Sequence, residues 1–209
     1  ANFYLYRTED INSEYPIEEQ HWAAAAERAD SSGTDLITTS LGYFDFDAPQ
    51  LSHTYADMNG ITTIAAKAAN LAVKKGIIVT ASAGNNGQDP YKYIITPADG
   101  TNVLAIGATD PNGIIAPFSA WGPSYDGRVK PDIASVGSGV YIAGTDGIPF
   151  PSGGTSFSNP NINGLIASLW QGFTEFKASD IIDAVKRSSS TYSAPDDRKR
   201  VAGPRLHQP

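Results

Sequence analysis

The most constraining feature of this 209-residue sequence is the alternation of short apolar runs with segments of helical periodicity. The clearest run, GIIVTASA at 76–83, is almost continuously apolar, which is typical of a strand buried on both faces of a parallel sheet. Further strands are predicted at 3–7, 35–41 and 102–110, and short extended segments in VKPDIAS and GVYIAG. Strands alternating with helices predict an α/β fold with a mainly parallel sheet.

Helical segments separate these strands. The first is predicted to begin at Pro16 and to end near Gly33, with Glu18 and Glu19 in its first turn, where carboxylates complement the helix dipole. A second helix is predicted from Ile61 to Gly76, and two more lie near the carboxyl end, one from 162 to 173 and one after residue 179. Residues 43–59 form an aromatic and acidic loop without periodicity, long enough to be a functional loop or an insertion. Four side chains of the first helix are expected to face inward: Trp22, Ala25, Ala26 and Ala29.

Composition excludes several function classes. The net charge of −7 argues against nucleic acid as a partner, because phosphate binding requires clustered lysine and arginine. The absence of cysteine excludes disulfides, thiolate metal sites and cysteine nucleophiles. No run approaches the roughly 18 apolar residues of a membrane span, and no signal peptide is visible. Because the only methionine is Met58, we expect a segment of the primary translation product to precede Ala1.

The segment SGGTSFSNPNINGLIASLW places Ser156 where a glycine-rich turn meets the start of a helix. Unpaired N–H groups in the first helical turn and the positive end of the dipole lie beside such a hydroxyl. Pro160 cannot donate a hydrogen bond to the Ser156 carbonyl, so we expect the serine's turn to stay outside the regular helix. Taken alone, this segment is explained better by an ordinary serine cap.

Two strand ends carry weaker signals. In ASAGNNG (81–87), the side-chain amide of Asn85 follows a buried strand and is suited to donate to a developing oxyanion, although asparagine and glycine also dominate ordinary turns. TTSLG (38–42) offers a backbone free to pair with an extended ligand, and alone it says nothing about function.

Together and in this order, the three motifs resemble those of the subtilisin-like serine proteases, or subtilases. The run G-T-S-x-x-x-P at 154–160 matches their nucleophile motif, SAGN at 82–85 their oxyanion motif and SLG at 40–42 their cleft strand. FSAWGP and KPDI, within 118–137, extend the resemblance from about residue 2 to about residue 188. The resemblance implies a sheet with helices on both faces, a partial catalytic domain at 1–190 and a tail at 191–209.

By this resemblance the protein is a serine endopeptidase, secreted or attached to the cell envelope, that acts on protein or peptide substrates. Ser156 is the implied nucleophile, and Asn85 and the Ser156 N–H are the implied oxyanion donors. The implied substrate-binding residues are Ser40, Leu41, Gly42, Ala81, Ser82, Ala83, Gly84 and Thr155.

The chain departs from the family pattern at the catalytic base. Subtilases carry an Asp in D-S/T-G and a His in H-G-T, and neither motif occurs here, while His21, His53 and His207 offer no substitute. A serine without a positioned base is a weak nucleophile, so we expect this chain alone to be nearly inactive. In the family, the Asp-bearing strand fills the middle of the sheet. The sheet is therefore expected to be incomplete at the amino-terminal end, and the missing segment or a second copy of the chain is expected to cover the gap.

Other interpretations remain beside this one. A peptide-binding pseudoprotease would use the strand end at 40–42 without cutting, and an α/β-hydrolase is disfavoured because GTSFS lacks the final glycine of G-x-S-x-G. His53 and Asp57, with Asp45 and Asp47 nearby, resemble a metal pair, but a solvated polar loop explains them better. Subtilases often carry structural calcium, yet no calcium-loop pattern matches here, so no cofactor or metal ligand is assigned.

Overall fold

The computed structural model describes residues 1–189; the predicted tail at 191–209, with His207, lies outside the described residues. A four-stranded parallel sheet forms the centre of the molecule, in the order β1 (Leu36–Thr39), β2 (Ile78–Ser82), β3 (Leu104–Thr109) and β4 (Ile133–Val136). Every residue of β2 and β3 is buried, as expected for strands covered on both faces. The predicted α/β fold with a parallel sheet is confirmed.

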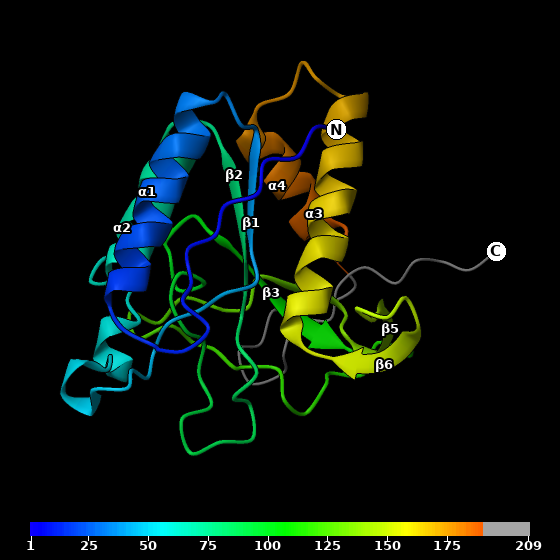
Figure 1. Cartoon of the computed structure of the whole chain (residues 1–209). Coiled ribbons are helices and arrows are strands. Elements are labelled where there is room, and N and C mark those ends of the chain that lie inside the picture. The colour runs from blue at the N-terminus through cyan, green and yellow to red at the C-terminus, as the bar shows by residue number, and fades with distance from the viewer. Residues whose placement is uncertain (190–209) are drawn as a thin grey trace.

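Helices cover both faces of this sheet (Figure 1). On one face lie α1 (Ile17–Ser31) and α2 (Ile64–Lys74), which share a core with Val79, Ala81 and Ala105 of the sheet. On the other face, α3 (Thr155–Gly172) and α4 (Ala178–Arg187) pack against Ile78 and Ile106. None of the helices within residues 1–189 is long and apolar enough to cross a membrane.

The first helix follows its prediction in position, with Glu18 and Glu19 in its first turn. Trp22, Ala26 and Ala29 are buried as expected, whereas Ala25 is only half-buried. Glu18 and Glu19 are 2% and 1% exposed, a burial that the sequence pattern did not predict. Buried carboxylates need hydrogen-bond or charge partners, so the groups around both side chains matter for the fold.

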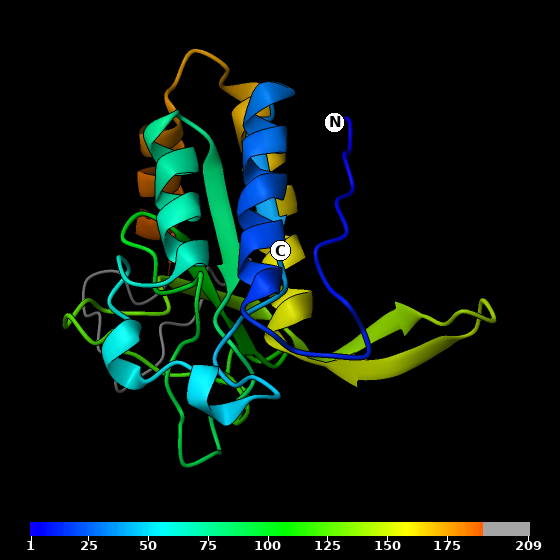
Figure 2. The same cartoon turned by 60° about the vertical axis from the view of Figure 1, so that its left-hand side comes forward.

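The predicted strand at 3–7 is wrong. These residues form no strand, and β1 is hydrogen-bonded only to β2 within the described chain, so it is an edge of the sheet. In Figure 2 the start of the chain, in dark blue below the N label, lies apart from the helices before the trace turns back toward α1. Phe3 and Leu5 are 86% and 94% exposed, because a single extended segment without a neighbouring strand has neither a ladder nor an apolar surface to cover it.

The remaining elements lead to the segment that contains Ser156. The loop at 43–59 contains two short 3₁₀ turns, Pro49–Leu51 and Tyr55–Asp57. An antiparallel hairpin of β5 (Ser138–Ala143) and β6 (Pro149–Gly153) projects from the body (Figure 2) and delivers the chain directly to α3. The strand β6 was not predicted, because its two prolines argue against a strand interior and are tolerated only at an edge.

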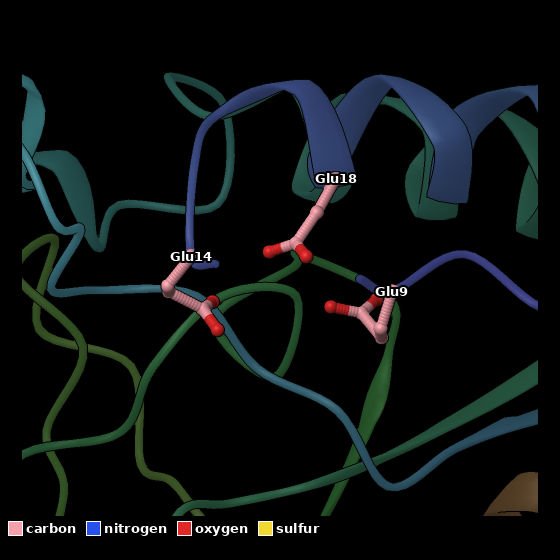
Figure 3. Close-up of side chains that lie close together, drawn as sticks. All are labelled: Glu9, Glu14 and Glu18. Carbon is pink, nitrogen blue, oxygen red and sulfur yellow. The ribbon is translucent and has the colours of Figure 1, made fainter. Parts of the chain in front are cut away.

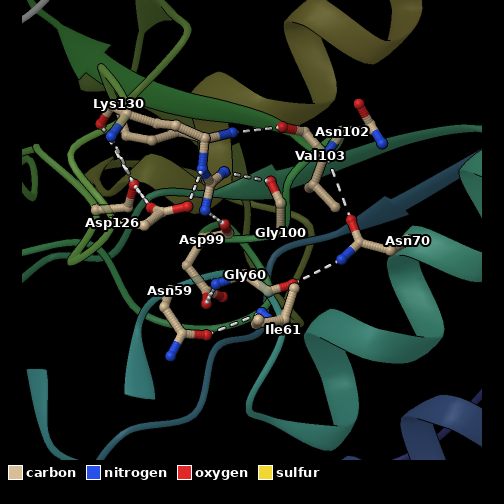
Figure 4. Close-up of polar contacts among 12 residues, drawn as sticks. Asn59, Gly60, Ile61, Asn70, Asp99, Gly100, Asn102, Val103, Asp126 and Lys130 are labelled. Carbon is tan, nitrogen blue, oxygen red and sulfur yellow. Dashed lines mark hydrogen bonds and ion pairs between the residues drawn. The ribbon is translucent and has the colours of Figure 1, made fainter. Parts of the chain in front are cut away.

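Buried polar contacts attach the segment before α2 to the segment before β3 (Figure 4). The Gly60 N–H donates to Asp99 Oδ2 at 2.7 Å, and Arg128 donates to the carbonyls of Asp99 and Gly100 at 2.7 and 3.1 Å. Gly60 has φ +81°, and a Cβ there would lie 2.8 Å from the Asp99 carbonyl oxygen, so only glycine fits. Burial raises the pKa of Asp99, and the Gly60 N–H and Arg128 act in the opposite direction.

Candidate active site

The carboxyl ends of β1 and β2 meet at one edge of the sheet, beside the start of α3. Thr39 is paired with Ala81, so the segment beginning at Ser40 and the segment ending at Asn85 leave the sheet side by side. Ligands of parallel α/β sheets bind beyond the carboxyl ends of the strands. The three sequence motifs, far apart along the chain, therefore lie together.

Ser156 is the second residue of α3 and is partly exposed. Its Oγ donates to the Ser40 carbonyl at 3.2 Å, and the Ser40 hydroxyl donates in return to the Ser156 carbonyl at 3.1 Å. These two reciprocal bonds connect the start of α3 to the end of β1.

The expectation that Pro160 keeps the serine's turn outside the helix is wrong. The helix runs without interruption from Thr155 to Gly172 and includes Pro160. The missing proline N–H leaves the Ser156 carbonyl without its usual helical donor, and the Ser40 hydroxyl supplies the replacement. A proline in the second turn is therefore accommodated by a side chain from another element.

The side chain of Asn85 is oriented by Thr155. The Thr155 N–H and hydroxyl both point at Asn85 Oδ1, at 2.8 and 3.0 Å. Because a backbone N–H can only donate, the atom that faces it must be the amide oxygen, and the amide nitrogen is directed away. A Cβ on Gly154 would lie 3.6 Å from Asn85 Nδ2, which places this nitrogen over the glycine turn that precedes Ser156.

Two hydrogen-bond donors therefore lie at the turn formed by Gly154 to Ser156. One is Asn85 Nδ2, and the other is the Ser156 N–H in the first turn of α3, which has no acceptor among residues 1–189. Donors fixed in position before the reaction stabilise negative charge that develops on an attacked carbonyl oxygen. The arrangement can support acyl transfer on a serine.

The residues predicted to bind substrate fall into two groups. Ser40 and Leu41 are exposed and Gly42 is half-buried, whereas Thr155 and the whole of Ala81 to Gly84 are buried. Gly84 has φ +115°, and its N–H donates to Thr155 Oγ1 at 3.3 Å. Ser40 and Leu41, after the end of β1, are thus accessible to a ligand, whereas the buried residues lie behind this surface.

A model of the subtilase family, peptidase S8, matches residues 1–204 of this chain. The chain belongs to this family. A subtilisin-like protease of Coccidioides posadasii is 36% identical over 110 residues, which cover 53% of this chain and 26% of that protein. Pyrolysin of Pyrococcus furiosus is 28% identical over 200 residues, covering 78% and 13% of the two chains. The chain thus spans only a minor part of these relatives.

The fold agrees with solved subtilase structures. The structure of S41 psychrophilic protease superposes with a TM-score of 0.70 at 25% identity, covering 95% of this chain and 66% of that one. Together with the family match, this places Ser156 and Asn85 on a subtilisin-like framework. The predicted family and fold are confirmed, while the roles of individual site residues stay predictions.

One polar residue of this subtilase site was missed by sequence reasoning. Asn159 is fully buried, and its Nδ2 donates to the Thr39 carbonyl at 2.8 Å and to Thr38 Oγ1 at 3.1 Å. It therefore fixes the first turns of α3 against β1, which sets the distance between Ser156 and Ser40. The available signal was its spacing three and seven residues before Ile162 and Ile166, which places Asn159 on the apolar face of the helix, where a polar side chain needs partners.

Neither histidine in the described part of this subtilase chain serves Ser156. His21 is exposed and its Nδ1 contacts the Thr8 carbonyl, while His53 Nε2 is bound to Glu19 Oε1. The alternative metal pair is not assembled, because Asp57 instead accepts from the N–H and hydroxyl of Thr54 at 2.8 and 2.7 Å. His53 and Asp57 are thus used for local structure.

The bond between Glu19 and His53 makes stability depend on pH. Burial acts to lower the pKa of His53, but the hydrogen bond and charge of Glu19 outweigh it and raise the pKa above 6.5. A histidine whose pKa is higher in the folded state than in the unfolded state stabilises the fold. This contribution is fully present below the unfolded-state pKa of about 6.5, and it is lost as the pH rises through the folded-state pKa. We therefore expect the free energy of unfolding to fall over that window.

Denaturant unfolding at a series of pH values, compared with His53→Gln, measures this effect. The variant should lose the His53 part of the pH dependence, and the difference between the two profiles isolates it from other titrating groups. His21→Gln is the matched control, because His21 is exposed, and it should follow the wild type. Parallel wild-type and His53→Gln profiles would contradict the assignment.

Proposed function

We propose that residues 1–190 form the carboxyl-terminal part of the catalytic domain of a serine endopeptidase, with Ser156 as its nucleophile. The observation that carries this proposal is the orientation of Asn85, whose oxygen is held by Thr155 so that its N–H group is available beside Ser156. A purely peptide-binding cleft has no use for a donor held in this position. Two donors and a hydroxyl at one point favour cleavage over binding alone.

The reaction we propose is acyl transfer. A histidine on a segment outside this chain removes the Ser156 proton, and Oγ attacks the peptide carbonyl carbon. Asn85 Nδ2 and the Ser156 N–H hold the resulting oxyanion. The histidine then gives its proton to the leaving amine, the C–N bond breaks, and water hydrolyses the acyl-enzyme by the same steps.

The substrate we propose is an extended segment of protein or peptide that pairs with the backbone of residues 40–42. Ser40 and Leu41 are exposed at the end of an edge strand, which is suited to this mode of binding. In line with the subtilase family, we propose that cleavage takes place outside the cell or at its envelope.

We further propose that the free edge of β1 and the exposed amino-terminal segment are covered by the part of the protein that carries the catalytic Asp and His, or otherwise by a second copy. Phe3 and Leu5 are almost fully exposed, and a bare strand edge favours association. The chain alone should therefore associate. A monodisperse 22.1 kDa monomer with cooperative unfolding would contradict this.

Activity is tested by expressing the chain with and without the upstream segment and measuring hydrolysis of an unstructured protein. Loss of the base should lower turnover by about 10⁶-fold, so the chain alone should be nearly inactive. A fluorophosphonate should label Ser156 only in the assembled protein. An assembled protein that binds peptides but neither cuts them nor takes the label would be a pseudoprotease and would overturn the proposal.

A further inference from the structure

Three carboxylates converge where the amino-terminal segment meets α1. Glu9, Glu14 and Glu18 each offer one oxygen, and these oxygens all lie within 4.8 Å of one another. In Figure 3 the three side chains point toward a common centre, Glu18 from the first turn of α1 and the other two from the segment before it. The site lies apart from the serine site, whose residues come from the ends of β1 and β2 and from α3.

Glu18 supplies an independent observation. Glu18 is 2% exposed, and its Oε1 accepts a hydrogen bond from the Asp10 N–H at 2.9 Å. Its Oε2 is buried as well and has no hydrogen-bond partner within residues 1–189. A buried carboxylate oxygen without a donor costs free energy, so an unpaired oxygen in this position points to a missing positive ligand.

The surroundings supply no positive side chain to fill that role. Glu9 Oε1 accepts from the hydroxyls of Tyr43 and Thr8 at 2.7 and 2.8 Å, which orients the carboxylate without neutralising it. Among residues 1–189, no lysine or arginine forms an ion pair with any of the three glutamates. No basic side chain of residues 1–189 therefore balances the negative charges of the cluster.

The pKa of Glu14 is affected by its burial and by the neighbouring carboxylates. Burial, followed by the charges of Glu18 and Glu9, raises the pKa of Glu14 to about 7. Near neutral pH, Glu14 is thus partly protonated when no cation is present. A bound cation would compete with this proton, so the site should be tested above that pH.

We propose that Glu9, Glu14 and Glu18 bind one calcium ion. Calcium takes oxygen ligands at about 2.3–2.6 Å, so oxygens on opposite sides of the ion lie up to about 5 Å apart, which agrees with the spacing of the cluster. Magnesium requires about 2.0–2.1 Å, and the cluster would have to contract to bind it. Waters would complete the calcium shell on the partly exposed side of Glu9 and Glu14.

A calcium ion here would fasten the amino-terminal segment to α1. Glu9 lies in the irregular segment and is bonded to Tyr43, which follows β1, while Glu18 belongs to the helix. Binding would therefore add a link between three parts of the chain that hydrogen bonds such as Asp10 N–H to Glu18 already join. The ion would stabilise the fold without entering the reaction at Ser156.

The test is titration calorimetry of the chelator-treated full chain with calcium chloride, at a pH above the pKa of Glu14. We expect one ion per chain, a higher unfolding temperature with calcium, and weaker binding of magnesium. Glu14→Gln and Glu18→Gln should each weaken calcium binding by at least about 10- to 100-fold, the loss that even indirect contacts to a metal produce. Glu27→Gln, an exposed carboxylate on the same helix, should bind like the wild type.

Glu14→Gln keeps the proposal testable if Glu18→Gln fails to fold. Its amide can donate to the unpaired Glu18 oxygen, so without calcium this variant should unfold at a higher temperature than the wild type, and calcium should not shift it further. Wild-type protein that takes up no calcium would overturn the proposal, as would Glu14→Gln with unchanged calcium affinity.

Discussion

Replacing Ser156 with alanine should abolish turnover in the assembled protease while leaving its fold intact. The substitution removes the attacking oxygen, and the loss of a serine nucleophile typically lowers kcat by about 10⁶-fold. Within residues 1–189 the Ser156 hydroxyl donates one hydrogen bond, to Ser40, so the free energy of unfolding should change by no more than about 1.5 kcal/mol. Peptide hydrolysis and thermal unfolding of the same preparation measure both quantities.

Ser40→Ala is the matched control. It removes the other hydroxyl of the reciprocal pair but leaves the nucleophile and the Ser40 carbonyl in place. Its turnover should fall far less than that of Ser156→Ala, because the Ser40 hydroxyl positions Ser156 and takes no part in bond making. Full activity in Ser156→Ala would reject Ser156 as the nucleophile, and equal losses in both variants would reduce its role to structure.

The second large effect is expected at Asn85. Loss of an oxyanion donor typically costs about 100- to 1,000-fold in kcat, or about 2.7–4 kcal/mol of transition-state stabilisation. Because the donor acts on charge that exists only in the transition state, kcat should fall while KM changes little. Steady-state kinetics of Asn85→Ala separate these two constants.

Asn85→Ala also removes the acceptor used by Thr155, so a second variant is needed. Asn85→Asp retains an oxygen for the N–H and hydroxyl of Thr155 and eliminates the amide donor. It should fold as stably as the wild type and lose at least as much turnover, because a carboxylate repels the oxyanion. Unchanged kcat in Asn85→Asp would exclude the donor role.

Periodic segments were predicted well because local chemistry decides them. The helix expected from Ile61 begins at Ile64, since Thr63 caps it by accepting from the Ala66 N–H. The burial of Glu19 could not be foreseen, because its partners His53 and Ala65 lie 34 and 46 residues away. The strand at 3–7 failed for a related reason: a strand exists only where another strand pairs with it.

The sequence predicted which residues belong to the site but not the hydrogen bonds that connect them. Motifs identified Ser156 and Asn85, but spacing alone could not show that Thr155 orients the Asn85 amide. Asn159 was missed because its bonds reach the chain 120 and 121 residues earlier. Its contacts became visible only once the sheet had brought β1 beside α3.

The reciprocal bonds between the two serines also describe a resting state. In the binding mode proposed above, an extended peptide that pairs with the end of β1 would use the Ser40 carbonyl as an acceptor, to which Ser156 Oγ donates in this structure. Ligand and nucleophile therefore compete for one oxygen, and an arriving peptide displaces the hydroxyl toward its own carbonyl. Under this proposal, peptide binding and the release of the Ser156 hydroxyl from Ser40 would be a single event.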